Sequence, residues 1–269
     1  MSEVVPSIKK KHIIDLAESG KRIDGRSLTD IRKLEIKTNI LDKAEGSATV
    51  KLGDTYVIAG IKFEIGTPFP DIPNEGVLSV NAEFLPLASP TFESGPPDER
   101  AIELARIVDR GIRSAEMIDT EKLCLIPGKK VWIVWVDIFI LDHCGNLIDA
   151  SALAALCALM TAKLPKTEII GDSIKILDEY TPLPISNLPI TITLAKIGNK
   201  LFVDPSIEEE EVMDCRISIS FVEKENQDYV CAIQKGGSGT FTPEELIRAV
   251  EIAKVKSQEL RKIVLSGGS

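Results

Sequence analysis

The first half of the chain alternates between hydrophobic and polar positions, which is the pattern of half-buried β-strands. This alternation predicts strands over four stretches, residues 31–38, 47–52, 55–65 and 77–85. Gly53 and Asp54 separate the second stretch from the third, so we expect these two to form a hairpin. A fifth stretch, residues 131–140, is almost continuously apolar and predicts a strand that is covered on both faces.

Helical spacing of apolar residues predicts three helices in the same half, over residues 8–19, 99–119 and 150–162. Asp98 and Asp149 directly precede the second and the third helix. We expect both to be N-caps, because an aspartate in that position accepts hydrogen bonds from unpaired backbone N–H groups. The third helix is rich in alanine and leucine, which predicts burial on nearly all sides.

The second half of the chain repeats the order of strands followed by a long helix. Strands are predicted at residues 190–197, 200–203, 215–222 and 229–234, with a hairpin turn at residues 226–228. Thr242, Pro243 and Glu245 form a capping box with proline at the first helical position, and they predict a final helix that reaches about Val264. Residues 163–189, with four prolines and little periodicity, are expected to form the seam between the two halves.

These patterns predict an α+β fold with two similar strand-plus-helix halves. The expected organisation is an N-terminal helix and extension over residues 1–30, a first half over 31–165, a connecting segment over 166–189 and a second half over 190–269. The halves share no repeat of individual residues, so their similarity rests on the order of the elements alone.

The charge of the chain limits its partners. Its 269 residues carry 32 Lys and Arg against 41 Asp and Glu, which gives a net charge of −9 at pH 7. Most of such a surface repels a polyanion, so a nucleic-acid site is expected only as a local basic patch. No stretch is long and apolar enough for a membrane span or an export signal, and we expect a cytoplasmic protein.

Few residues are available as metal ligands. The five cysteines form no C-x-x-C pair and only two histidines are present, so we expect reduced, mostly buried thiols and no zinc or histidine site. An acidic run remains as a candidate for Mg²⁺ binding or acid–base chemistry, with a solvated loop as the more common alternative: Asp204, Glu208 to Glu211 and Asp214. The turn at residues 142–146 is a second candidate, because a phosphate can bind at the N-terminus of the helix that follows; simple capping is the alternative.

The candidate basic patch lies on the second predicted helix. Arg106, Arg110 and Arg113 are spaced i, i+4, i+7, so they lie on one side of the helix, opposite its apolar residues. One interpretation is a binding site for a polyanion. The other is a solvated face on which Glu99 and Glu103 form ion pairs with these arginines.

Several motifs resemble those of the RNase PH family, and they occur in the family's order. Arg22-Ile23-Asp24-Gly25-Arg26 is similar to the opening R-x-D-G-R, and residues 46–55 resemble the hairpin motif that follows it. Further similar stretches are residues 85–87, 103–110 and 203–205. The stretches that look most like the non-catalytic RNase PH-like subunit of the archaeal exosome are residues 95–99, 102–106 and 132–137.

This resemblance covers about residues 20–260 and implies an RNase PH-type fold. It also implies a hexameric ring built from heterodimers with the catalytic RNase PH-like subunit, cap subunits that carry RNA-binding domains, and single-stranded RNA degraded 3′-to-5′ by phosphorolysis. It further implies that Arg106 and Arg110 face the RNA path, whereas Arg113 has weaker support. Phosphate and Mg²⁺ are expected in the partner's site, and this chain is expected to have no cofactor of its own.

Three departures from the catalytic members predict that this chain is not an enzyme on its own. Their phosphate-binding G-S-R or G-T-R turn corresponds to Gly145-Asn146-Leu147, which has no cation. Of their two aspartates, Asp214 matches the second, but Glu208 stands at the first. Residues 88–97 contain no arginine, where catalytic members are rich in it. The alternative is a self-sufficient phosphorolytic 3′-to-5′ exoribonuclease that uses Asp214 with Glu208; a small-molecule kinase is disfavoured because no Gly-rich phosphate loop precedes a helix.

Overall fold

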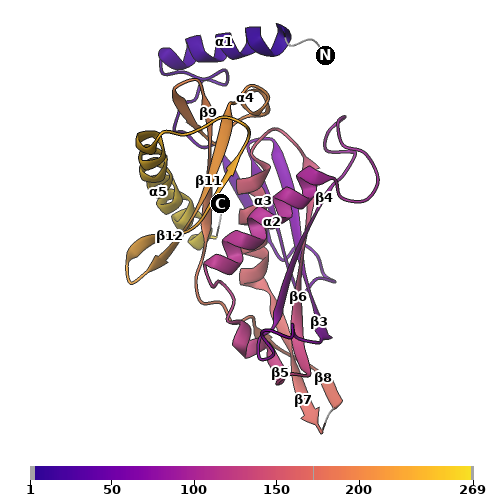
Figure 1. Cartoon of the computed structure of the whole chain (residues 1–269). Coiled ribbons are helices and arrows are strands. Elements are labelled where there is room, and N and C mark those ends of the chain that lie inside the picture. The colour runs from indigo at the N-terminus through magenta and orange to yellow at the C-terminus, as the bar shows by residue number, and fades with distance from the viewer. Residues whose placement is uncertain (1–3, 172, 268–269) are drawn as a thin grey trace.

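The computed structural model describes residues 4–171 and 173–267, with the backbone only for residues 4–7 (Figure 1). Its elements are stacked in layers. A six-stranded sheet packs on helices α2 (Glu99–Ser114) and α3 (Leu147–Thr161), and a four-stranded sheet lies on the other side of these helices. Helix α5 (Pro243–Leu265) covers the outer face of the smaller sheet. This combination of sheets and helices confirms the predicted α+β fold class.

The larger sheet is built mainly from the first half of the chain. Its strands are β1 (Leu34–Thr38), β2 (Gly46–Leu52), β3 (Thr55–Gly66), β4 (Val77–Phe84), β5 (Cys124–Ile126) and β6 (Lys130–Asp142). They follow the order β1-β2-β3-β6-β4, with β5 paired to β6, and all neighbours are antiparallel except β4 and β6. The expected hairpin is confirmed, because β2 and β3 pair on either side of the Gly53-Asp54 turn.

Strand β6 differs from the prediction that both of its faces are covered. Its burial alternates: Val134, Val136, Ile138 and Ile140 are buried, whereas the residues between them, such as Trp135 and Phe139, are half-buried. The buried face packs toward α3, and among the described residues no layer covers the other face. Apolar residues such as Trp135 and Phe139 nevertheless occupy this less covered face, which is why the alternation is hidden in the sequence.

The smaller sheet belongs to the second half of the chain. Its strands are β9 (Ile190–Ile197), β10 (Lys200–Val203), β11 (Cys215–Lys224) and β12 (Gln227–Gly236), all antiparallel in the order β10-β9-β11-β12. The turn between the last two strands lies at Glu225 and Asn226, which both have positive φ, so it begins one residue earlier than predicted. The capping box of α5 is confirmed, since Thr242 and Glu245 bond each other's backbone N–H groups.

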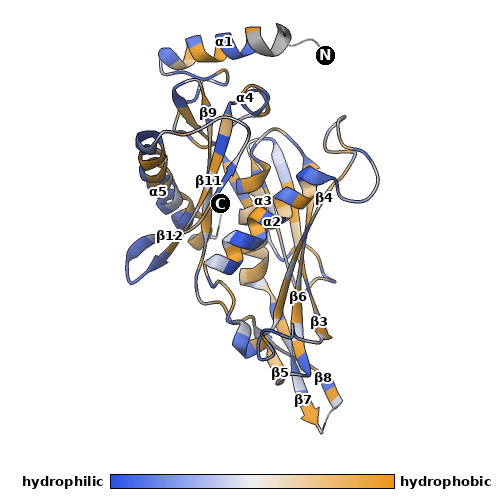
Figure 2. Ribbon diagram, in the orientation of Figure 1, coloured by the Kyte–Doolittle hydropathy of each residue, from blue (hydrophilic) through white to orange (hydrophobic). Residues whose placement is uncertain are grey.

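Helix α2 follows the sequence signals at its start but ends earlier than predicted. The Asp98 side chain accepts a hydrogen bond from a first-turn N–H at 2.9 Å, as expected for an N-cap. The helix ends at Ser114 and not near Asp119, because Glu116 adopts a left-handed backbone with φ of 53°. Figure 2 shows hydrophilic and hydrophobic segments alternating along this helix, which has one buried and one exposed side.

The N-cap of α3 also differs from the prediction. Asn146, whose backbone is left-handed (φ 51°), caps the helix by accepting the Asp149 N–H through its side chain at 3.3 Å. Asp149 therefore lies inside the helix. Its buried carboxylate accepts the backbone N–H of Thr193 at 2.9 Å and the Thr193 hydroxyl at 2.7 Å. Because Thr193 belongs to β9, this contact joins the two halves of the chain.

The segment predicted as a seam contains a β-hairpin. Strands β7 (Lys163–Ile170) and β8 (Ser173–Pro182) pair with each other and extend from one end of the molecule (Figure 1). The strands were missed because most of their residues on both faces are exposed. Without a buried face, a strand has no hydrophobic alternation to signal it.

The remaining elements lie at the periphery. Helix α1 (Val4–Glu18) packs Ile13 and Ala17 on Phe202 and Val212 at the opposite end from the hairpin. Two short helices, η1 (Thr120–Leu123) and α4 (Ile207–Glu210), complete the described chain. None of the helices in the described residues is both long and apolar enough to cross a membrane.

Candidate nucleic-acid interface

The three arginines predicted as a basic patch lie together on the exposed side of α2. Arg106, Arg110 and Arg113 are exposed, while Leu104 and Val108 on the opposite side are buried in the core. This arrangement follows from the helical period, because residues spaced by three or four positions share one face.

The ion pairs of α2 differ from those of the alternative interpretation. Glu103 Oε1 lies 2.8 Å from Arg216 Nη2, and Arg216 belongs to β11. Arg113 pairs with Asp109 at 2.7 Å and also donates to a backbone carbonyl of β4. Glu99 and Glu103 therefore do not neutralise the arginine stripe. Arg106 and Arg110 form neither a hydrogen bond nor an ion pair with any residue that the structure describes.

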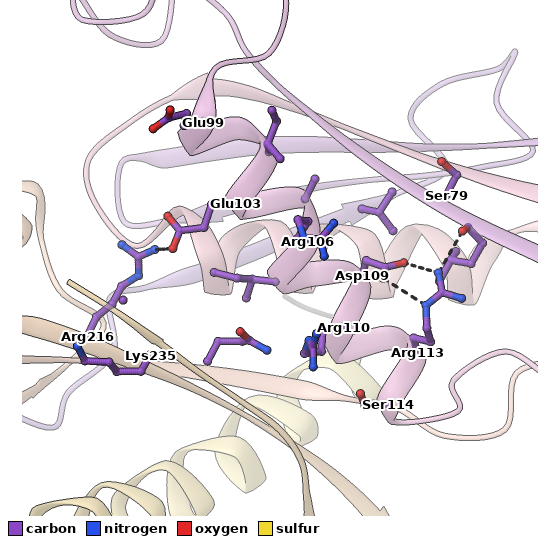
Figure 3. Close-up of a pocket in the computed structure, with 17 residues that line it drawn as sticks. Ser79, Glu99, Glu103, Arg106, Asp109, Arg110, Arg113, Ser114, Arg216 and Lys235 are labelled. Atoms are coloured by element: carbon purple, nitrogen blue, oxygen red, sulfur yellow. Dashed lines mark hydrogen bonds and ion pairs between the residues drawn. The ribbon is translucent and has the colours of Figure 1, made fainter. Parts of the chain in front are cut away.

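A groove of about 770 Å³ runs alongside this face of α2 (Figure 3). One wall is α2 itself, with Arg106, Arg110 and Arg113, and the edge of β4 contributes Ser79. The other wall comes from β11 and β12 and includes Arg216. In a chain with net charge −9, a groove that holds two arginines without acidic partners is the local basic patch that a polyanion requires.

The turn before α3 is closed to an external phosphate. The Asn146 N–H, which points out of the helix N-terminus, donates to Glu210 Oε1 at 2.8 Å. The Asn146 amide donates to Asp204 at 2.8 Å. Burial raises the pKa of the Glu210 carboxyl to about 7, although the Asn146 N–H counteracts this effect. With Leu147 at the start of the helix, the turn offers carboxylates and an apolar side chain where an anion would bind, so of the two interpretations the structure supports capping.

Part of the acidic run is buried and paired with arginines, and is not the solvated loop of the alternative interpretation. Arg22 donates through Nε to Glu209 Oε1 at 2.8 Å, and these side chains are 0% and 2% exposed. Asp204 is equally buried and pairs with Arg32 at 2.7 Å and with Arg26 at 3.0 Å. The described residues contain no group of three His, Cys, Asp or Glu side chains that is arranged to hold a metal ion.

The R-x-D-G-R motif therefore has a structural role that the sequence analysis missed. Arg22 and Arg26 anchor the acidic segment against the N-terminal extension, and Arg32 also donates to the backbone carbonyls of Cys144 and Gly145. The one available signal was the set of arginines between residues 22 and 32 in a chain with an excess of acids. Pairing them with particular acids required the three-dimensional structure.

One of the two carboxylates of the rival exoribonuclease interpretation, that of Asp214, is engaged elsewhere. Asp214 Oδ1 accepts a hydrogen bond from Lys10 at 2.5 Å, and its Oδ2 accepts the Gly198 N–H at 2.8 Å. Burial alone raises the pKa of Asp214, but these two contacts lower it below its usual range. The Asp214 carboxylate therefore binds α1 through Lys10 and the turn at Gly198. This is a structural role and not one in acid–base chemistry.

The cysteines form no disulfide in the described residues. Cys157 and Cys215 are buried, and the other three are half-buried: Cys124, Cys144 and Cys231. The expectation of mostly buried thiols is therefore only partly right. Burial raises the pKa of the Cys157 thiol to about 12, so it stays protonated at neutral pH.

Two family models match the chain in succession: domain 1 of the 3′ exoribonuclease family over residues 30–165 and domain 2 over residues 187–256. The chain belongs to the 3′ exoribonuclease family. Among curated members of this RNase PH family, "Exosome complex component Rrp42" of Thermococcus kodakarensis is 54% identical over 265 residues, which are 98% of this chain and 96% of that protein. The protein of the same name from Methanopyrus kandleri is 47% identical over 97% of both chains.

Solved structures of the exoribonuclease family agree with this assignment. A chain of the Archaeoglobus fulgidus exosome with RNA bound to the active site superposes with a TM-score of 0.87 at 44% identity, covering 97% of this chain and 99% of that one. A chain of an archaeal exosome core gives 0.84 at 42% identity, covering 97% and 98%. Rice Rrp46, at 18% identity and a TM-score of 0.71 over 91% of this chain and 99% of that one, shares the fold alone.

These comparisons confirm the predicted RNase PH-type fold and the assignment to the non-catalytic exosome subunit. The rival interpretation, a self-sufficient exoribonuclease that uses Asp214 with Glu208, is wrong. The physical reasons lie in the geometry above, since Asp214 is bound by Lys10 and the phosphate turn is filled by Glu210.

Proposed function

We propose that this exosome subunit binds single-stranded RNA through Arg106 and Arg110 and presents it to a catalytic RNase PH-like partner. The observation that carries the proposal is the pair of exposed arginines without acidic partners, which line one groove in an acidic chain. The partner performs 3′-to-5′ phosphorolysis, and phosphate and Mg²⁺ belong to its site.

The spacing of the two arginines suits an extended strand. Residues four positions apart on a helix are separated by about 6 Å along its axis. Each guanidinium can then take a different phosphate of one RNA strand through forked, charge-assisted hydrogen bonds. Arg113 contributes less, because it donates through both Nε and Nη2 to Asp109 and through Nη2 also to a backbone carbonyl of β4, so fewer of its donors are open to a phosphate.

The assembly that we propose is a hexameric ring of alternating subunits, with RNA-binding cap subunits on one side. The support is the similarity to chains of archaeal exosome structures over 97% of this chain. Native mass measurement of the chain co-expressed with the catalytic subunit tests this point, and equal numbers of the two subunits are expected. A chain that stays monomeric in the presence of the partner contradicts it.

The test of RNA binding uses the assembled ring, with phosphate omitted so that the RNA stays intact. For a single strand, log affinity falls with log salt concentration at a slope of about 0.7 per phosphate contacted, so Arg106→Gln with Arg110→Gln should flatten the slope by roughly 1.4. The matched control is Arg248→Gln with Lys254→Gln, which removes the same charge from exposed positions of α5 outside the groove. Ring assembly and melting temperature should be unchanged in both variants. An unaltered salt slope in the groove variant removes these arginines from the RNA path.

A further inference from the structure

We infer that Arg216 is a third phosphate-binding residue of the groove and that it holds the RNA strand from the wall opposite α2. This inference rests on the proposed function of the groove. Arg216 lies on β11, in the second half of the chain, whereas Arg106 and Arg110 lie on α2 in the first half, and all three line the same groove (Figure 3). A strand that contacts all three arginines is held between the two halves.

The guanidinium of Arg216 has unused donors. Its Nη2 lies 2.8 Å from Glu103 Oε1, and the side chain keeps 20% of its surface exposed. Within the described residues its nitrogens make no other ion pair, and none of them is a buried atom without a partner. A guanidinium carries five N–H donors in a planar fork. The donors that Glu103 does not occupy are therefore available to the oxygens of a phosphate.

The guanidinium of Arg216 packs directly against Gly236. This glycine is the cross-strand neighbour of Arg216 on β12, and a Cβ at Gly236 would lie 3.0 Å from both Cζ and Nε of Arg216. Glycine therefore lets the guanidinium lie directly against the strand, while a Cβ at this position requires the guanidinium to shift by a few tenths of an ångström. This contact with Gly236 holds the arginine in place before RNA binds, which reduces the entropy lost on binding.

Glu103 competes with phosphate for Arg216. The two residues also line a smaller pocket of about 130 Å³ that includes His143, so their ion pair borders both the groove and this pocket. A phosphate bound to Arg216 shares the guanidinium with the Glu103 carboxylate or replaces it. Removal of the Glu103 charge should therefore strengthen RNA binding, and the gain should depend on the presence of Arg216.

The first experiment measures the salt dependence of RNA affinity in the assembled ring. Arg216→Gln should flatten the slope by about 0.7, whereas Arg248→Gln on α5 should leave it unchanged. Gly236→Ala is the second variant. It changes no charge and meets only the end of a flexible side chain, so the ring should assemble normally and bind RNA more weakly. An Arg216→Gln ring with parental slope would overturn the inference, and a Gly236→Ala ring with parental affinity would contradict the positioning of Arg216 by Gly236.

The second experiment is a double-mutant cycle between Glu103 and Arg216. Glu103→Gln should raise RNA affinity about two- to five-fold in the parent ring and have no effect in the Arg216→Gln ring. A gain that persists without Arg216 means that Glu103 acts by general repulsion, and it contradicts a phosphate contact at Arg216.

The two proposals fail in distinguishable ways. One outcome is that the slope of log RNA affinity against log salt is flatter in the Arg106→Gln, Arg110→Gln ring and unchanged in the Arg216→Gln ring. The groove then binds RNA through α2 alone. If neither variant changes the slope, the groove is not the RNA path and both proposals are wrong.

Discussion

Glu103 forms its ion pair across the groove with Arg216, at 2.8 Å, and not with the arginines of its own helix. The reason is tertiary: α2 packs beside β12, and this packing brings β11 within reach of the exposed side of the helix. As a consequence, no acidic side chain of the described residues pairs with Arg106 or Arg110. In an acidic protein, uncompensated cations in one groove indicate a site for an anionic ligand.

The buried pair of Arg22 and Glu209 should be among the most costly contacts to break. Glu209→Gln leaves the Arg22 guanidinium buried without a counter-charge, and we expect the free energy of unfolding to fall by about 3–5 kcal/mol. Urea unfolding measures this change. Glu179→Gln is the matched control, because Glu179 pairs with Lys166 on the surface, where the side chains are 65% and 47% exposed. A surface pair should change stability by less than about 1 kcal/mol. Equal effects of the two substitutions would contradict a structural role for Arg22.

Gly145 should tolerate no side chain. Its φ is +93°, and a Cβ would lie 2.5 Å from the Ser206 carbonyl carbon and 2.6 Å from the Ile207 N. Gly145→Ala must therefore separate the turn from the acidic segment, and we expect a loss of several kcal/mol on thermal unfolding, where backbone strain alone costs about 1–2 kcal/mol. Gly128→Ala has similar strain, with φ of +72° and no atom within 4 Å, and should cost only that smaller amount. Comparable losses in the two variants would show that the close contact is absent.

Asp149 should make stability depend on pH. Burial raises the pKa of this carboxyl to about 7, against the hydrogen bonds from Asn146 and Thr193 that lower it. A folded pKa above the unfolded value of about 3.9 means that ionisation opposes folding, so this contribution is absent at pH 4 and grows until the pH passes about 7. Relative to the parent, Asp149→Asn should therefore gain about 2–4 kcal/mol of unfolding free energy between pH 4 and pH 8.

The measurement for Asp149 is the difference in unfolding free energy between variant and parent at each pH. The loss of hydrogen-bond geometry adds a constant offset, so the trend and not the absolute value is diagnostic. Asp178→Asn, at an exposed position of β8, is the control and should show no such trend. A difference that stays flat from pH 4 to pH 8 would mean that Asp149 is ionised throughout.

The chain alone should release no nucleoside diphosphates from single-stranded RNA in the presence of phosphate and Mg²⁺. The phosphate turn carries Leu147 instead of arginine, and its Asn146 N–H is already bonded to Glu210. For the same reason Leu147→Arg should not restore activity. Chromatographic detection of the diphosphates tests both expectations, and turnover that survives repurification and disappears in Asp214→Asn would refute them.

Much of the fold was predictable because its signals are local. The β2–β3 hairpin, the Asp98 cap and the Thr242–Glu245 capping box each depend on residues that are near one another in the chain. The stripe of Arg106, Arg110 and Arg113 likewise follows from the helical period. The β7–β8 hairpin was missed for a physical reason, since exposed strands leave no hydrophobic alternation.

The amino-acid sequence by itself determined which elements form and which side chains share a face, because backbone hydrogen bonding and side-chain period act over a few residues. It also carried the family motifs and the loss of the phosphate-binding arginine at Leu147. Only the tertiary structure decided the partners of the charges: Glu209 with Arg22, Asp214 with Lys10, and Glu103 with Arg216. An ion pair forms where packing brings two groups within a few ångströms, and that distance is independent of their separation along the chain.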